Sequence, residues 1–238
     1  MFRLETFVLY DKKPKSITIR NYTKKDFDAI IEMERLSYPP PFPQELLWEE
    51  EQLSSHVDAF PLGCLCVEMD KKVVGVLTTM IINYDPDEPH TWDEITNEGY
   101  VKGSHQPKGE TLYVVDINVH RDFRHYNIGR VMVQSAYYLV VKLDLDRLLG
   151  CGRMPNYHKY AKDLSPEEYI EKVIDGEISD PVISFMFKCG RRPVKILANY
   201  VEDNKSRDYA CLMEWRNPFK NVPKLPQQKF LKDMKDIK

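Results

Sequence analysis

One short stretch of the chain brings together the residue types that bind an anionic group. Three arginines, Arg121, Arg124 and Arg130, lie in or beside a polar turn, and Gly129 allows the backbone to approach a bulky phosphate. Free amides at the first turn of a helix, together with the helix dipole, favour negative charge there. The stretch therefore predicts a phosphate-binding turn. From spacing alone, the alternative is an ordinary strand-turn-helix unit with solvated arginines.

Two apolar segments must position this turn. Residues 112–119 are short, apolar and rich in Val and Ile, as expected of a buried strand. After residues 120–126, apolar or small residues recur with helical spacing, at Ile128, Val131, Met132, Ser135, Tyr138 and Leu139. The sequence therefore predicts a strand, a turn and a helix in immediate succession.

The run Arg124-His-Tyr-Asn127-Ile-Gly129 resembles the (Arg/Gln)-x-x-Gly-x-(Gly/Ala) signature of the GNAT acyltransferases. In that superfamily the signature binds the pyrophosphate of acetyl-CoA. The resemblance implies that this cofactor is held by Arg124, His125, Tyr126, Asn127, Ile128, Gly129 and Arg130. One position departs, because Asn127 stands where the first Gly is usual. Asn tolerates left-handed backbone angles, so we expect the turn to form.

Length, charge and cysteine content narrow the class of protein. The chain has 238 residues and a net charge of −3, which argues against non-specific nucleic-acid binding. No apolar run reaches membrane-spanning length, and we read no secretion signal. Cys64 and Cys66 are too close together for the common zinc spacings, so we expect no metal site. Five cysteines, odd in number, favour reduced thiols in a cytoplasmic protein.

The predicted order of elements extends the resemblance to a whole domain. It runs strand 16–20, helices 23–36 and 44–57, strands 62–69 and 73–82, strand 112–119, the central helix, strand 148–151, helices 165–175 and 181–188, and strands 193–200 and 207–215. This order resembles the GNAT acyl-CoA N-acyltransferase fold. The fold class is α/β (α+β), with a mixed, mostly antiparallel sheet of about seven strands flanked by helices.

We divide the chain into a GNAT domain, residues 16–216, between an N-terminal extension, 1–15, and a C-terminal tail, 217–238. The first ten residues could add an edge strand, and the last half of the tail a short helix. Residues 83–110 form an insertion whose first part is acidic. It is either a solvated loop or a wall of the acceptor site that attracts a cationic amine, with Trp92 and Tyr100 supplying apolar area.

A narrower resemblance comes from residues 153–161 and 214–218. These runs look like the GNAT modules that are fused, in some bacterial proteins, to a nitrilase-like carbon–nitrogen hydrolase. The chain ends before any such domain, so we do not carry the hydrolase activity over, and association with a separate hydrolase stays open.

The resemblance also implies how acyl transfer would proceed. The pantetheine arm would lie along Ile117 to Val119 and meet Asn156. A backbone N–H near Asn118 or Val119 would polarise the thioester carbonyl. Asp116 is the candidate base that deprotonates the amine, although a structural Asp is an equal interpretation, and Glu110 acting through water is an alternative.

The proton donor to the leaving thiolate is the clearest departure from the family. Relatives often use a Tyr four residues before the Gly that ends the last helix, and here that position is Met186. Tyr160 is the preferred substitute because it lies about one helical turn after Asn156. Tyr157 and His158 are alternatives, and plain packing is the simpler role for each of the three.

The resemblance and these residues together predict an enzyme that transfers acetyl from acetyl-CoA to a small-molecule or peptide amine in a ternary complex, and the acidic insertion favours a cationic acceptor. The alternative is a CoA-binding regulatory module with weak turnover, suggested by the missing Tyr at position 186. We expect no nucleic-acid or membrane partner, while exposed edge strands would permit a homodimer.

Overall fold

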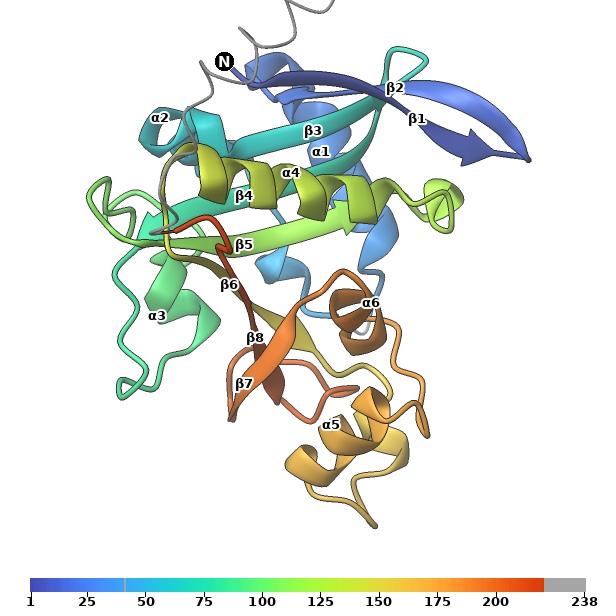
Figure 1. Cartoon of the computed structure of the whole chain (residues 1–238), viewed down its shortest axis with the longest axis vertical. Helices are drawn as coiled ribbons and strands as arrows, with labels where there is room; N and C mark the ends of the chain where they lie inside the picture. The colour runs from blue at the N-terminus through green and yellow to red at the C-terminus, as the bar shows by residue number, and fades with distance from the viewer. Residues whose placement is uncertain (41, 221–238) are drawn as a thin grey trace, which may run out of the picture.

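The computed structural model describes residues 1–40 and 42–220, which form one eight-stranded sheet in the order β1-β2-β3-β4-β5-β6-β8-β7 (Figure 1). The strands are β1 (Arg3–Tyr10), β2 (Lys13–Asn21), β3 (Cys64–Met69), β4 (Lys72–Ile82), β5 (Thr111–Val119), β6 (Arg147–Arg153), β7 (Arg192–Leu197) and β8 (Ala210–Arg216). Only β5 and β6 pair in parallel. The predicted mixed, mostly antiparallel sheet is confirmed. It has eight strands rather than about seven, because β1 pairs with β2 along its whole length.

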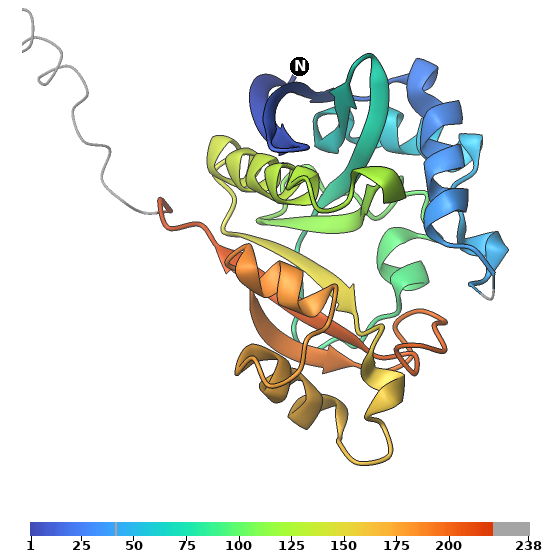
Figure 2. The same cartoon turned by 90° about the vertical axis from the view of Figure 1, so that its right-hand side faces the viewer.

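Helices cover both faces of the sheet. The helices are α1 (Phe27–Ser37), α2 (Glu50–Ala59), α3 (Trp92–Thr96), α4 (Ile128–Lys142), α5 (Pro166–Ile174) and α6 (Ile183–Lys188). Figures 1 and 2 show α4 across one face of β3, β4 and β5, with α1 and α2 on the other. Alternate residues of β4 serve the two cores: Leu77 packs in the cluster of α4, and Val76 in the cluster of α1.

One predicted helix differs from the structure, and another is present as predicted. The helix predicted over residues 44–57 is a 3₁₀ turn, Gln44–Leu46, followed by α2. The extra helix predicted after Ser165 is present as α5, and Ser165 caps it: the Glu168 amide donates to Ser165 Oγ at 3.2 Å. The insertion 83–110 is not structureless, since it holds α3. The helix predicted in the last half of the tail lies outside the described residues.

The two parallel strands separate soon after they begin. β5 and β6 pair only from Thr111 to Tyr113 and from Arg147 to Leu149, although both strands continue beyond these residues. Figure 1 shows β6 turning away from β5. Within the described residues, the later part of β5 therefore has an edge that faces no strand, and this gap is where an extended ligand can pair with it.

Candidate active site

The turn before α4 has the backbone conformation that the sequence predicted. Asn127, at the N-cap of α4, has φ 63° and ψ 13°, in the left-handed region that its family position normally gives to Gly. His125 also has a positive φ, 76°. The side chains of Arg121, Arg124 and Arg130 are exposed around this turn. The helix terminus thus opens to solvent with cationic side chains beside it, as an anion site requires.

Contacts from other elements fix the two sides of this turn. Arg124 Nε donates to the Val119 carbonyl at 3.1 Å, which ties the arginine to the end of β5. Tyr126 Oη donates to Asp11 Oδ1 at 2.9 Å, across 115 residues of sequence. A Cβ at Gly129 would lie 3.1 Å from the Phe185 ring of α6, so α6 leaves little room for a side chain there. The turn is therefore held by β5, by the N-terminal hairpin and by α6.

The antiparallel ladder decides which amides of β5 face the gap. The His120 amide donates to the Val74 carbonyl at 3.0 Å, and the register continues with Val119 opposite Gly75 and Asn118 opposite Val76. Because hydrogen-bonded and non-hydrogen-bonded pairs alternate, the main chain of Asn118 bonds to β4. The amides of Ile117 and Val119 instead face the gap toward β6.

A β-bulge lies next to these residues. The β4–β5 register shifts between Thr78, which is opposite Asp116, and Thr79, which is opposite Val114, so Val115 is the extra residue. Its carbonyl accepts a hydrogen bond from Trp92 Nε1 at 3.2 Å. The bulge re-aims β5 at the point where it leaves β6, and α3 supports it.

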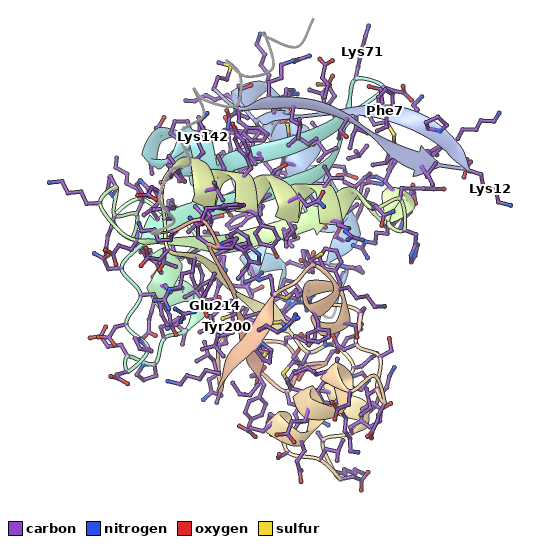
Figure 3. The ribbon with its side chains drawn as sticks, in the orientation of Figure 1. Phe7, Lys12, Lys71, Lys142, Tyr200 and Glu214 are labelled. Atoms are coloured by element: carbon purple, nitrogen blue, oxygen red, sulfur yellow. The ribbon has the colours of Figure 1, made fainter. Side chains whose placement is uncertain are left out.

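A cavity of about 170 Å³ opens at this divergence. Its walls come from the α1–α2 connection, α3, the strands β5 and β6, and the segment after β7. The lining residues are Glu34, Tyr38, Phe42, Leu46, Trp48, Trp92, Val114, Val115, Asp116, Ile117, Cys151, Arg153, Val182, Tyr200 and Val201. Figure 3 labels Tyr200, which follows β7. The cavity is mostly apolar and aromatic, with only a few charged groups, which is the composition of a small-molecule site.

Two carboxyl groups share one side of this cavity. Glu34 is 4% exposed, and its Oε1 accepts a hydrogen bond from Asn118 Nδ2 at 2.8 Å. Asp116 Oδ2 is out of contact with solvent and has no hydrogen-bond partner among the described residues. Burial raises the pKa of Asp116 to about 6. Burial, reinforced by the charge of Asp116, raises the pKa of Glu34 further, so Asp116 ionises first and Glu34 keeps its proton.

An arginine and a tyrosine complete the polar lining. Arg153 Nη1 donates to Asp203 Oδ2 at 2.9 Å, and its guanidinium lies 5.1 Å from the Tyr38 ring centroid and 5.4 Å from that of Phe42. Burial and the charge of Asp116 raise the pKa of Tyr38, whereas Arg153 and Arg124 lower it. Tyr38 therefore lies within electrostatic reach of both the carboxyl pair and the arginine of the turn.

The structure separates several predicted site residues from this cavity. Asn156 Nδ2 donates to the Ser179 carbonyl at 3.0 Å, and Tyr160 packs on Tyr169 of α5 with ring centroids 5.6 Å apart. Tyr157 Oη donates to the Leu164 carbonyl, and His158 Nδ1 lies against main-chain carbonyls. As far as residues 1–40 and 42–220 define the cavity, none of these four lines it. Of the predicted site residues, Asp116 and Ile117 on β5 line the cavity, and the run 153–161 contributes only Arg153.

Two further expectations have definite outcomes. Met186 is 6% exposed, and its sulfur would lie 2.5 Å from a Cβ at Gly152, so this position is core and has no room for a tyrosine. In the insertion 83–110, Trp92 lines the cavity, but Asp85, Asp87 and Glu88 are exposed to solvent. The acidic residues of the insertion do not line the cavity. The carboxyl groups that line the cavity belong to Glu34 on α1 and Asp116 on β5.

Among the cavity residues that the sequence did not single out are Glu34, Tyr38 and Trp48. Glu34 carried a usable signal, because it continues the apolar face of Phe27, Ile30 and Ile31 at helical spacing. An acid on that face is expected to be buried. Tyr38 and Trp48 flank a proline-rich connection that has no periodicity, so no local pattern marks them.

No group of three or more His, Cys, Asp or Glu side chains in residues 1–40 and 42–220 is placed to hold a metal ion. No helix in the same part of the chain is long and apolar enough to cross a membrane.

The chain is similar in sequence to two curated bacterial proteins. The chain is 45% identical over 221 residues to the "Uncharacterized N-acetyltransferase YkwB" of Bacillus subtilis (strain 168), covering 92% of this chain and 97% of that one. It is 38% identical over 216 residues to the "Probable hydrolase YhcX" of the same organism, covering 90% of this chain but only 40% of that one.

A solved structure has the same fold at low sequence identity. It is the "GphF GNAT-like decarboxylase in complex with isobutyryl-CoA", with a TM-score of 0.69 and 21% identity over 84% of this chain and 98% of that chain. In addition, residues 27–164 match the model of the acetyltransferase (GNAT) family. The chain therefore belongs to the GNAT acetyltransferase family.

Proposed function

We propose that the protein transfers an acetyl group from acetyl-CoA to an amine by direct attack within a ternary complex. Family membership supports N-acyl transfer in general. One observation carries the more specific proposal. The gap between β5 and β6 connects the cationic turn before α4 with a cavity that holds a buried carboxyl pair. Donor and acceptor would approach the same point from the two ends of this gap.

The donor would be held from its diphosphate to its thioester. Amides of residues 125–130, with Arg124 and Arg130, would bind the diphosphate. The pantetheine arm would pair with the free edge of β5, where the amides of Ile117 and Val119 face the gap. Since the main chain of Asn118 bonds to β4, we assign the polarisation of the thioester carbonyl to the Val119 amide. Such a donor typically contributes a few kcal/mol to lowering the barrier.

Asp116 would act as the base. An acceptor amine arrives protonated, and the carboxylate of Asp116 would take one proton from it; the free amine then attacks the thioester carbon. The C–N bond forms and the C–S bond breaks; the thiolate takes the hydroxyl proton of Tyr38, and the second proton of the amine restores that hydroxyl. Glu34 would hold its own proton, with its orientation fixed by Asn118. We assign Asn118 this positioning role through its side chain.

Tyr38 is our candidate for the proton donor to the thiolate, in place of Tyr160. It lines the cavity, whereas Tyr160 packs against α5. Burial, reinforced by the negative charge of Asp116, raises the pKa of Tyr38 at the start of the reaction. Once Asp116 has accepted a proton, that charge is gone, and Tyr38 becomes a better acid at the step where the thiolate leaves.

The experiment is a titration with CoA and acetyl-CoA followed by an assay of thiol release with a panel of amines. We expect calorimetry to detect CoA binding, and acetyl-CoA to be consumed only when an amine is present. Arg124→Gln should weaken CoA binding, whereas Arg216→Gln, at the far end of the sheet, should not. The proposal fails if CoA binds but no amine in a panel of metabolites and peptides is acetylated. The five free cysteines are consistent with a cytoplasmic site for this reaction.

A further inference from the structure

The cavity carries opposite charges on two of its walls. The carboxyl pair of Glu34 and Asp116 lies where α1 faces β5, and Arg153 lies at the end of β6. Most of the remaining wall is apolar or aromatic, formed by residues such as Trp48, Trp92, Tyr200 and Val201. A ligand that presents a cation to the carboxyl pair and an anion to Arg153 would complement this lining.

Arg153 has hydrogen-bonding capacity that the protein does not use. A guanidinium carries five N–H groups, and among the described residues Arg153 donates only to Asp203 Oδ2. The arginine side chain is 26% exposed, and it lines both the cavity and a second hollow beyond it. Several donors on a charged group at a cavity wall suit a carboxylate, which can accept two of them side by side.

The arginine is also held in place before any ligand arrives. Asp203 is 6% exposed and accepts hydrogen bonds from the Ser206 hydroxyl and the Lys205 amide, so it is a fixed anchor. The rings of Tyr38 and Phe42 pack against the guanidinium from the α1–α2 connection. A guanidinium fixed by elements on both sides binds an anion with little loss of conformational entropy.

We propose that the acyl acceptor is a free α-amino acid. This inference rests on the proposed function and specifies its substrate. The ammonium group is bound and deprotonated at Asp116, the carboxylate is bound by Arg153, and the side chain lies on the aromatic and aliphatic wall. An α-amino acid places its two charges on one carbon, which suits a cavity of about 170 Å³ with both partners in its lining. Apolar side chains are preferred, because that wall offers mainly apolar contacts.

The substrate series comes first, because it uses the unaltered protein. We expect kcat/KM for an apolar amino acid such as leucine to exceed that for its amide and for its decarboxylated amine by about 30- to 100-fold, since each analogue lacks the carboxylate that would bind the unused N–H groups of Arg153. Equal rates for leucine and its decarboxylated amine would overturn the proposal. So would a preference for peptides with a free N-terminus over the single amino acid.

A variant tests the assigned partner. Arg153→Gln should remove most of the difference between leucine and its amide, chiefly by raising KM for leucine, and Arg153→Lys should restore part of it. Arg216→Gln is the matched control, since Arg216 lies at the opposite end of the same strand pair. Thermal denaturation and CoA titration of each variant report whether it folds. If folded Arg153→Gln keeps the full preference for the free carboxylate, the assignment to Arg153 is wrong.

The outcomes separate this inference from the proposed function. If amines of all kinds are acetylated without regard to a carboxylate, the protein is an acetyltransferase and the amino-acid inference fails. If CoA binds and no amine reacts, the proposed function fails. A third series, with malonyl-CoA in place of acetyl-CoA, tests whether Arg153 binds a carboxylate of the acyl donor. A gain for malonyl-CoA that Arg153→Gln abolishes would overturn the inference.

Discussion

Two carboxyl groups that share one buried site cannot both be ionised near neutral pH, and this condition sets the roles of Glu34 and Asp116. Burial raises the pKa of both groups, but only Glu34 is also opposed by a neighbour that has already ionised. Asn118 donates to Glu34 and leaves Asp116 Oδ2 without a partner. Asp116 lines the cavity, and its Oδ2 has no hydrogen-bond partner among the described residues, which is the reason we assign the proton transfer to Asp116.

The activity of the protein should therefore depend on pH through Asp116. In the proposed mechanism the ionised form of Asp116 is the base, so kcat/KM for an amine should rise with pH through about 6, the pKa of Asp116, apart from the titration of the amine itself. Asp116→Asn should lower kcat by about 100-fold or more and remove this rise, while the Kd for CoA stays unchanged. Rates measured from pH 5 to 9 check this.

Asp58→Asn, on the exposed side of α2, is a matched control that should leave the profile unaltered. If Asp116→Asn kept its rate and its pH profile, another group would have to be the base.

The carboxyl group of Asp116 should also make the free energy of unfolding depend on pH. In the folded state the pKa of Asp116 is about 6, above its usual value of 3.8, so the folded protein binds this proton more tightly than the unfolded chain. Its contribution to the free energy of unfolding is full below about pH 4 and is lost as the pH rises through about 6.

Asp116→Asn removes that loss, because the amide stays neutral. We expect the variant to melt a few degrees above the wild type at pH 7.5 and to differ little from it at pH 4, since about 1 kcal/mol corresponds to 2–4 °C in a protein of this size. Differential scanning calorimetry at the two pH values measures this. A variant less stable at pH 7.5 would mean that Asp116 stabilises the fold instead.

At the scale of elements, the part of the site that we propose binds the donor could be predicted from the sequence, because its residues are close together along the chain. The strand, turn and helix from Thr111 to Lys142 are consecutive, and their periodicity and one left-handed Asn identify them. The acceptor side combines α1, the connection after it, β6 and the segment after β7, which only the folded sheet brings together.

Tyr160, the predicted proton donor to the thiolate, shows why distance along the sequence does not by itself place a side chain. The spacing predicts that Tyr160 lies one helical turn after Asn156. In the structure only Tyr157–Lys159 form a 3₁₀ turn, and the segment packs on α5 rather than on β5. The register of a short irregular segment depends on what it packs against, and its own sequence does not encode that. Arg153, at the end of a regular strand, is the member of that run that reaches the cavity.

The insertion makes a specific prediction through α3. Trp92 bonds to the bulge at Val115 through its indole N–H, and its own amide donates to the Tyr200 carbonyl at 2.7 Å, so it joins two walls of the cavity. Trp92→Phe removes the indole bond but keeps an aromatic ring. We expect KM for the amine to rise several-fold, since one hydrogen bond contributes about 0.5–1.5 kcal/mol.

The Kd for CoA should not change in Trp92→Phe, because α3 lies on the acceptor side. Ile95→Val on the same helix is the control for a general loosening of α3. An equal loss of CoA affinity in Trp92→Phe would show that the insertion supports the donor site instead.

At the scale of the whole molecule, the N-terminal hairpin connects one edge of the sheet with the donor site. β1 is an edge strand, and Phe7 and Leu9 on it are 69% and 62% exposed. Figures 1 and 3 show the hairpin, with Phe7 and Lys12 labelled in Figure 3, reaching past the end of α4 where the turn lies. Tyr10 packs on Tyr126, with ring centroids 4.3 Å apart, and Asp11 accepts the Tyr126 hydroxyl. Residues 1–15, predicted to be an extension of the domain, thus brace the turn that we propose binds the donor.

This brace should be measurable as CoA affinity. The turn contains two residues with positive φ that are not glycine, His125 and Asn127, so it needs support from outside to hold its amides in one arrangement. Asp11→Ala removes one hydrogen bond of about 0.5–1.5 kcal/mol, and we expect the Kd for CoA to rise about 2- to 10-fold. Glu5→Ala, on the same hairpin but away from the turn, should leave the Kd unchanged. Because Asp11 touches neither the cavity nor the gap, kcat at saturating acetyl-CoA should stay at the wild-type value. A fall in kcat without a change in Kd would mean that the hairpin acts on the reaction by another route than the turn.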